Sequence, residues 1–221
     1  MSKGRIALLV PFAFALLLVG CRSSAGPLTP PPSFTAGKLP RYVGGYRLPF
    51  DGAWRVHRTH YEMKNDQAFA VDLVLDADHP RRGGRNTDYP TYGLSIVADG
   101  PGVVALAVDG VPDNEPNVAN GYEAHGNFIV LDHGNGEFSL FAHLNPGSVR
   151  VRAGQVVGMG QELGLCGNSG HSTMPHLHWQ VMDNYQPHLA RARAIRLLGY
   201  ERNGAASGAR LESGDIVRPL K

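Results

Sequence analysis

The feature of this sequence that most constrains its fold is the shortness of its apolar runs. After about residue 45, short apolar runs alternate with Gly, Pro, Asn and Asp, and apolar residues seldom recur at helical spacing. The 28 glycines and 16 prolines of the chain favour turns and interrupt helices. We therefore expect an all-β fold with an antiparallel sheet or β-sandwich core, built from the runs at 68–75, 102–110, 127–144 and 148–164.

Several connections between these runs carry signals of their own. Asn135-Gly136 stands between two apolar runs and favours a tight hairpin turn, because such turns need positive φ. Residues 191–196 (RARAIR) predict a short surface helix instead. The connections 76–93 and 109–126 are longer than joining two strands requires, which predicts that they form the walls of a groove.

The N-terminal segment has the composition of an export signal. A basic start is followed by an apolar run at 6–19 that is short for a membrane span. The run ends in Leu18-Val19-Gly20-Cys21, which resembles the cleavage box of bacterial lipoproteins. The resemblance implies that residues 1–20 are removed and that acyl chains on Cys21 anchor the protein to a membrane surface. Arg22 after this cysteine favours the outer membrane, with the protein facing the periplasm.

The rest of the chain divides into a tether and one domain. Residues 21–45 are rich in proline, which predicts an extended tether, and residues 46–221 have the length of one domain. Without residues 1–20 the chain has 19 acidic side chains and an equal number of Lys and Arg, so the charge excess typical of nucleic-acid binding is absent. With Cys21 acylated no internal disulfide can form, and Cys166 is predicted to be a small buried hydrophobic residue.

The stretch 175–180 (PHLHWQ) places two histidines one residue apart. In a strand, His176, His178 and Gln180 would share one face, while the apolar residues of the stretch would share the other. A His-x-His pair arises often by chance in a chain with ten histidines, so this motif needs partners elsewhere.

Candidate partners stand in three other segments. Asp72 interrupts an apolar run, so its carboxylate must be paired, hydrogen-bonded or bound to a metal, and backbone amides or an arginine would satisfy it as well. His57 and His60 precede it, and His143 ends another apolar run. Two histidines and an aspartate, with a fourth position left for water, have the composition of a catalytic zinc site. Further imidazoles nearby can transfer protons and stabilise an oxyanion.

The order of these residues resembles that of the lysostaphin-type, or LytM-type, zinc peptidoglycan endopeptidases. That family has a His and an Asp early in the chain, an isolated His at a strand end, and a His-x-His strand after a GNSG loop. The corresponding elements here are His60 and Asp72, FAHL (141–144), GNSGHST (167–173) and PHLH (175–178). The resemblance covers about residues 45–185 and implies a lysostaphin-type fold, similar to a duplicated hybrid motif, with a terminal hairpin through 214–217.

The resemblance also implies roles for five residues. Zn²⁺ would be held by His60, Asp72 and His178, while His143 and His176 would act on the water, the substrate carbonyl and the developing oxyanion. The implied activity is hydrolysis of peptide cross-links of peptidoglycan in the cell envelope. The alternative is a non-catalytic peptidoglycan-binding lipoprotein that activates another cell-wall hydrolase. Proteins of that kind lack part of the ligand set, whereas this chain has all five residues. The pattern specifies neither the bond that is cut nor the oligomeric state.

The sequence departs from the family pattern in two places. The interval between His60 and Asp72 is longer than in the best-known members, so it must form a loop, and His57 stays an alternative first ligand. Met174 replaces a common glycine. Asn168 and Ser169 are expected to form a turn. The histidines in connections are expected to be solvated, with His171 a candidate substrate contact; they are His79, His125, His133, His171 and His188.

Overall fold

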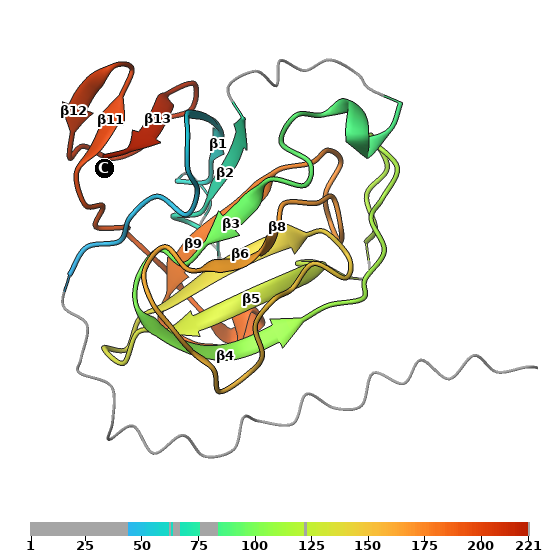
Figure 1. Cartoon of the computed structure of the whole chain (residues 1–221), viewed down its shortest axis with the longest axis horizontal. Coiled ribbons are helices and arrows are strands. Elements are labelled where there is room, and N and C mark those ends of the chain that lie inside the picture. The colour runs from blue at the N-terminus through green and yellow to red at the C-terminus, as the bar shows by residue number, and fades with distance from the viewer. Residues whose placement is uncertain (1–43, 62, 64–66, 76–83, 122, 221) are drawn as a thin grey trace, which may run out of the picture. The chain divides into compact units, whose positions relative to one another are not determined.

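Antiparallel strand pairing organises the chain, as Figure 1 shows. This computed structural model describes residues 44–61, 63, 67–75, 84–121 and 123–220. The predicted signal segment, its cysteine and nearly all of the tether lie outside these residues. Within the described residues, no helix has the length and apolar character needed to cross a membrane.

The described residues form two sheets and two 3-10 turns. The elements are β1 (Trp54–Thr59), β2 (Val71–Leu75), η1 (Asn86–Asp88), β3 (Ser95–Val97), β4 (Gly102–Val108), β5 (Asn127–Asp132), β6 (Phe138–Leu144), β7 (Val156–Val157), β8 (Glu162–Leu165), β9 (Leu177–Met182), η2 (Pro187–Leu189), β10 (Ala192–Arg193), β11 (Tyr200–Arg202), β12 (Ala205–Ser207) and β13 (Ile216–Pro219). The main sheet has the order β12-β11-β13-β1-β2-β9-β6-β5-β4-β7, with β10 paired to β9, and the small sheet pairs β3 with β8. The predicted all-β fold with an antiparallel sheet is confirmed.

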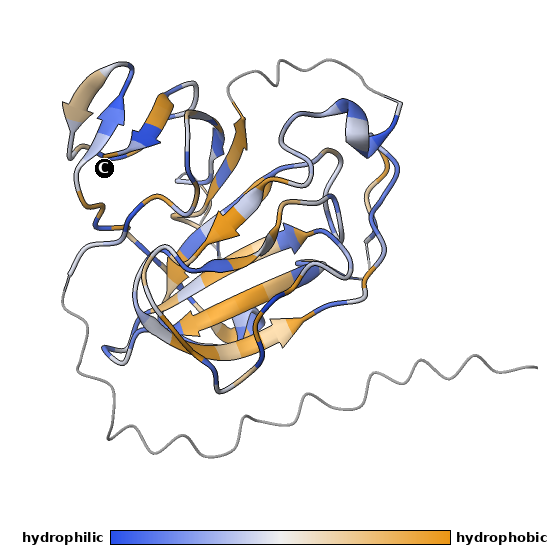
Figure 2. Ribbon diagram, in the orientation of Figure 1, coloured by the Kyte–Doolittle hydropathy of each residue, from blue (hydrophilic) through white to orange (hydrophobic). Residues whose placement is uncertain are grey.

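The two sheets share one apolar core. Ile96 of β3 and Leu163 of β8 belong to the same buried cluster as Phe141 of β6 and Trp179 of β9. Figure 2 shows hydrophobic residues along much of β2, β3 and β5. Burying one large apolar side chain such as Phe141 contributes about 1.5–3 kcal/mol. The core therefore fixes β9, the strand that carries His178, from one of its faces.

Strand β9 lies at the centre of the main sheet, between β2 and β6. Its residues alternate as predicted, because Leu177, Trp179 and Val181 lie in the main core. The opposite face carries His178, Gln180 and Met182. The register places Asp72 of β2 opposite His178 on one side and Ala142 of β6 opposite His178 on the other. Strand pairing thus brings residues remote in sequence to one point of the sheet.

The hairpin predicted around Asn135-Gly136 is confirmed as the β5–β6 pair. Its connection runs over residues 133–137, with positive φ at Gly134 and Gly136, so it is wider than a two-residue turn. Cys166 is fully buried in the apolar core, as predicted.

The prediction of a short helix over 191–196 is wrong. Ala192 and Arg193 form β10, which pairs with Met182 and Val181. Strand β2 pairs with β9 only over Leu177–Trp179, and the rest of that edge binds β10. Hydrogen bonding to the open edge of β9 outweighs the local helical pattern.

The C-terminal segment contains more antiparallel strands than the one hairpin predicted through 214–217. Residues 214–217 lead into β13, which pairs with both β1 and β11, while β11 and β12 form a hairpin of their own. The segment is therefore part of a multistranded extension of the main sheet and not one isolated hairpin. Asn203, with φ of 52°, and Gly204 turn the chain between β11 and β12.

Candidate functional site

His60, Asp72 and His178 meet beside the centre of the main sheet. His60 directly follows β1, Asp72 lies in β2 and His178 lies in β9, and β2 pairs with both of the other strands. His60 Nε2 lies 2.9 Å from Asp72 Oδ2, and His178 Nδ1 lies 2.9 Å from Asp72 Oδ1. All three side chains are buried, and one ligand atom from each lies within 4.8 Å of the others. Two imidazole nitrogens and a carboxylate oxygen at this spacing are suited to a divalent metal ion.

The loop between His60 and Asp72 returns the chain to the sheet. The backbone N–H of His60 donates to the carbonyl of Ala70 at 3.0 Å, which closes this connection beside the site. His57 is exposed, while His60 is buried against Asp72. The geometry favours His60 over His57 as the residue that completes the cluster.

His143 and His176 lie beside these three residues. The rings of His143 and His176 have centroids 4.8 Å apart, and His176 Nε2 lies 3.7 Å from Asp72 Oδ1. His143 Nδ1 donates to the carbonyl of Ser169 at 2.8 Å, and His176 Nδ1 donates to the carbonyl of Met174 at 2.9 Å. Nε2 of each ring is therefore the nitrogen that remains for a substrate or a water molecule. The structure thus brings together all five residues that the sequence predicted.

The backbone of His143 is held in a conformation that L-residues seldom adopt. Its φ is 63°, in the left-handed region, which costs a non-glycine residue of order 1–3 kcal/mol. The backbone N–H of His143 donates to the carbonyl of His125, and its carbonyl accepts from Gly167 N–H. These bonds hold the ring toward the cluster at the end of β6.

The site favours the ionised form of the Asp72 carboxylate and the neutral form of the two flanking imidazoles. Burial alone would raise the pKa of Asp72, but the charge of His176 and hydrogen bonds from His178 and His60 hold that pKa well below its usual range. Burial lowers the pKa of His143 well below its usual range, and it also lowers the pKa of His176 although Asp72 opposes this shift. At neutral pH the site therefore combines an ionised carboxylate with two neutral imidazoles that can accept protons.

The cluster opens into a pocket of about 430 Å³. Seven histidines line this pocket; besides the four in the cluster they are His57, His125 and His171. The long connection 109–126 contributes Ala124 and His125 to the lining, as predicted for a groove wall. Residues 76–83 of the other long connection lie outside the described part of the chain, and its described remainder, 84–93, does not line the pocket.

The GNSG loop is more than the turn that the sequence indicated. Asn168 and Ser169 are fully buried. Ser169 Oγ donates to the carbonyl of Leu144 at 2.7 Å and accepts from Asn127 N–H, while the Ser169 carbonyl orients His143. Gly126 packs so closely that a Cβ there would lie 2.4 Å from Ser169 Oγ. The loop therefore fixes the tautomer of His143, a role that its sequence did not indicate.

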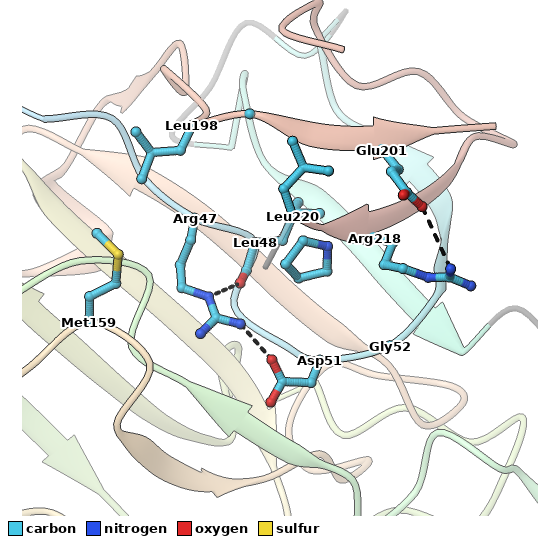
Figure 3. Close-up of a pocket in the computed structure, with 11 residues that line it drawn as sticks. Arg47, Leu48, Asp51, Gly52, Met159, Leu198, Glu201, Arg218 and Leu220 are labelled. Carbon is cyan, nitrogen blue, oxygen red and sulfur yellow. Dashed lines mark hydrogen bonds and ion pairs between the residues drawn. The ribbon is translucent and has the colours of Figure 1, made fainter. Parts of the chain in front are cut away.

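A second, larger pocket of about 1170 Å³ lies elsewhere and is shown in Figure 3. Its charged residues are already paired, as Arg47 with Asp51 at 2.6 Å and Arg218 with Glu201 at 3.6 Å. Its lining contains no histidine or cysteine among the described residues. Its volume alone would favour this pocket as the functional site, but the histidines and Asp72 that line the smaller pocket favour that one.

One predicted assignment outside the site is wrong. His133 was expected to be solvated, but it is 1% exposed. Its Nδ1 donates to the carbonyl of Pro101, and its ring packs against Tyr46. Of the other histidines in connections, His171 and His188 are exposed and His125 is half-buried, while His79 lies outside the described residues.

An all-β fold with a carboxylate held between two imidazoles at a pocket defines a candidate metal-dependent hydrolase. Residues 87–189 match the model of Peptidase family M23, so this part of the chain is similar to that family. The match includes His143, His176 and His178, whereas His60 and Asp72 precede it.

The chain is also similar to named proteins and to a solved structure. The chain is 30% identical over 142 residues to peptidoglycan DD-endopeptidase ShyA of Vibrio cholerae, covering 64% of this chain and 28% of that protein. It is 41% identical over 66 residues to DD-carboxypeptidase/endopeptidase Mpg of Neisseria meningitidis, covering 28% of this chain and 14% of the relative. A crystal structure of a putative peptidase M23 from Pseudomonas aeruginosa is 27% identical, with a TM-score of 0.43, over 65% of this chain and 46% of the other. The chain thus spans under a third of the length of ShyA and of Mpg.

Proposed function

We propose that this protein is a zinc-dependent endopeptidase that hydrolyses peptide cross-links of peptidoglycan. The observation that carries the proposal is the position of Asp72, whose two oxygens each lie 2.9 Å from an imidazole nitrogen, those of His60 and His178. Two flanking imidazoles at the same pocket supply the groups that hydrolysis needs. The family match and the names of the relatives support a peptidase acting on peptidoglycan.

The residues present fit a zinc ion by their chemistry. Two neutral imidazoles and one carboxylate are common zinc donors, and three protein ligands leave a position for water or substrate. When bound, zinc lowers the pKa of a coordinated water to about 7 and polarises a carbonyl oxygen. The ligands assigned are His60 through Nε2, His178 through Nδ1 and Asp72 through its carboxylate.

The flanking histidines would move the protons of the reaction. His143 and His176 are neutral at pH 7, so Nε2 of either ring can accept a proton from the attacking water and pass it to the leaving amine. While it holds this proton, the same ring is an imidazolium and can donate a hydrogen bond from Nε2 to the developing oxyanion. The carbonyls of Ser169 and Met174 hold the Nδ1 protons, which keeps both rings turned toward the pocket.

The proposal is tested with purified protein, zinc and defined sacculi. We expect the parent protein to release muropeptide fragments whose masses identify the bond that is cut, and we expect the H178A variant to release none. A matched variant, H188A, removes an exposed imidazole outside the pocket and should retain turnover. Equal turnover by the H178A variant and the parent would reject the role of His178.

The alternative is a non-catalytic peptidoglycan-binding protein that activates another hydrolase. Such a protein would bind sacculi without releasing fragments and would lack a stoichiometric metal. The complete set of two imidazoles, one carboxylate and two flanking imidazoles favours the enzyme. Metal analysis of the purified protein separates these functions, with one zinc per chain expected for the peptidase.

We also propose that Cys21 carries the lipid anchor and that the domain faces the periplasm from the outer membrane. The support is the cleavage-box resemblance at 18–21 and the presence of an arginine, and not an acidic residue, at position 22. A C21S variant should lose the mass of the acyl chains and should leave the membrane fraction. Retention of the C21S variant in that fraction would contradict the anchor.

A further inference from the structure

Gln180 is a buried amide at a position where its neighbours are apolar. It lies two residues after His178 on the same face of β9 and is 1% exposed. Across the sheet it pairs with Leu140, and Met182 follows on the same face; both belong to the second apolar cluster. Burying an amide costs free energy unless hydrogen bonds compensate for the loss of water. The polar residue at this position therefore needs an explanation that packing does not supply.

The hydrogen bonds of Gln180 orient its amide toward His178. Gln180 Nε2 lies 3.7 Å from Met182 Sδ, which places the amide nitrogen on the side of the sulfur. Gln180 Oε1 lies 3.1 Å from His178 Nε2. Because an amide oxygen only accepts, Nε2 of His178 must carry a proton. Nδ1 of the same ring, which donates to Asp72 Oδ1 at 2.9 Å, is then the nitrogen that would give up its proton to a metal ion.

The other imidazoles of the cluster are held in the opposite sense. Nδ1 of His143 and Nδ1 of His176 donate to backbone carbonyls, and His60 Nδ1 lies 3.0 Å from Met63 Sδ. Each of these rings therefore presents Nε2 to the site. His178 differs because it presents Nδ1, and its Nε2 is bonded to a side chain that substitution can remove.

We propose that Gln180 is a positioning residue that fixes the tautomer and rotation of His178, so that Nδ1 is the metal-ligating nitrogen. The inference depends on the metal site of the proposed function. Hydrogen-bond partners of metal-ligating imidazoles typically contribute about 10–100-fold to metal affinity, because they orient the ring and raise its basicity. An amide acceptor at residue 180 would act in this way without touching the metal or the substrate.

The test measures zinc affinity of the full-length protein by competition with a chromogenic chelator. We expect Q180L and Q180M to bind zinc about 10–100-fold more weakly than the parent. We expect Q180E to bind at least as tightly as the parent, because a carboxylate accepts the Nε2 proton more strongly. S139A is the matched control, since it removes a buried hydrogen bond from β6, opposite Val181, without touching His178. Its zinc affinity should equal that of the parent.

A second readout follows the tautomer directly. Long-range proton–nitrogen spectra of the zinc-loaded parent should show His178 with its proton on Nε2. Loss of this pattern is expected in Q180L and its retention in Q180E. Unchanged zinc affinity and unchanged His178 spectra in both apolar variants would overturn the inference. Q180M keeps the length of the side chain, so it remains informative if Q180L does not fold.

The outcomes also separate this inference from the proposed function. A parent protein that binds no zinc would contradict the metal site itself. A parent that binds zinc with the same affinity as Q180M would contradict only the role of Gln180. Equal losses in Q180M and Q180E would show that shape at residue 180, and not hydrogen bonding to His178, sets the affinity.

Discussion

Two clusters that each combine an aspartate with histidine lie on opposite faces of the central strand β9. We call them the open cluster, which consists of His60, Asp72, His143, His176 and His178, and the closed cluster, which consists of Asp99, His133, Ser139 and Trp179. Neighbouring residues of β9 supply one member to each. In the closed cluster, Ser139 Oγ lies 2.5 Å from Asp99 Oδ2 and 2.8 Å from His133 Nε2.

The pKa values of Asp72 and Asp99 are shifted in opposite directions. Burial raises the pKa of Asp99, although His133, Ser139 and Trp179 oppose the shift. At Asp72 the charge and hydrogen bonds of the surrounding imidazoles outweigh burial and lower the pKa. Several imidazoles around one carboxylate stabilise its ionised form enough to outweigh burial, whereas a single imidazole at 3.6 Å does not outweigh it. The carboxylate able to bind a cation is therefore Asp72.

The two clusters also differ in whether they are reached from a pocket. Ser139, Asp99 and His133 form a serine, histidine and aspartate group, but Ser139 is fully buried and bridges the other two. A catalytic triad needs the histidine in the middle and an exposed hydroxyl. The closed cluster therefore ties β6 and β9 to the loop that carries Asp99, while the open cluster faces the 430 Å³ pocket. The comparison teaches that residue types alone do not identify an active site.

The largest expected effect comes from D72N in the open cluster. The amide keeps the shape of the side chain but removes the charge that two imidazoles and a metal ion require. We expect turnover of peptidoglycan to fall by more than about 1,000-fold, beyond the 10–100-fold that loss of an outer partner causes. Zinc should no longer raise the melting temperature of the variant. A D72N variant with parental turnover would place the catalytic centre elsewhere.

These two clusters also show how far sequence reasoning reaches. Asp72 and His178 could be predicted because the alternation of polar and apolar residues and the order of the motifs along the chain are visible in the sequence. His133 was misassigned, because its burial depends on Tyr46 and Pro101, which are remote in sequence. The face that holds Gln180 was predicted, but its bond to His178 depends on side-chain rotation that spacing does not reveal. The strand at 192–193 was missed for a similar reason, since the open edge of β9 is a property of the assembled sheet.

The next largest effect should come from D99A in the closed cluster, on stability and not on chemistry. The substitution leaves Ser139 Oγ and Trp179 Nε1 without their buried acceptor. We expect the free energy of unfolding to fall by about 2–4 kcal/mol, since unpaired buried groups cost about 1–3 kcal/mol each. Urea denaturation measures this change. Zinc affinity of the folded fraction should stay within about twofold of the parent, because Asp99 lies behind β9 and not in the pocket. A selective loss of zinc binding in D99A would abolish the distinction between the clusters.

A smaller effect concerns the pH dependence of stability. The pKa of Asp99 is raised in the folded protein, so the native state binds more protons than the unfolded state above pH of about 4. The contribution of Asp99 to stability is therefore greatest at low pH and is lost as pH rises through the folded pKa. D99N cannot ionise, so the parent should lose stability relative to this variant as pH increases. Urea titrations at several pH values measure the stability of the parent minus that of D99N, and a value that stays constant or rises with increasing pH would show that the pKa of Asp99 is not raised.

The smallest effect should come from H171A at the rim of the open cluster. His171 is exposed and lines the pocket, and its backbone N–H, which donates to the carbonyl of Ala124, is unaffected by the substitution. Stability should therefore change by less than about 0.5 kcal/mol. If His171 contacts the peptide, KM should rise by about two- to fivefold with kcat unchanged, because such a contact is made equally in the ground and transition states. H188A provides the control, since His188 is equally exposed but lies outside the pocket. Identical kinetics for these two variants would confine substrate recognition to the buried members of the open cluster and to the other walls of the pocket.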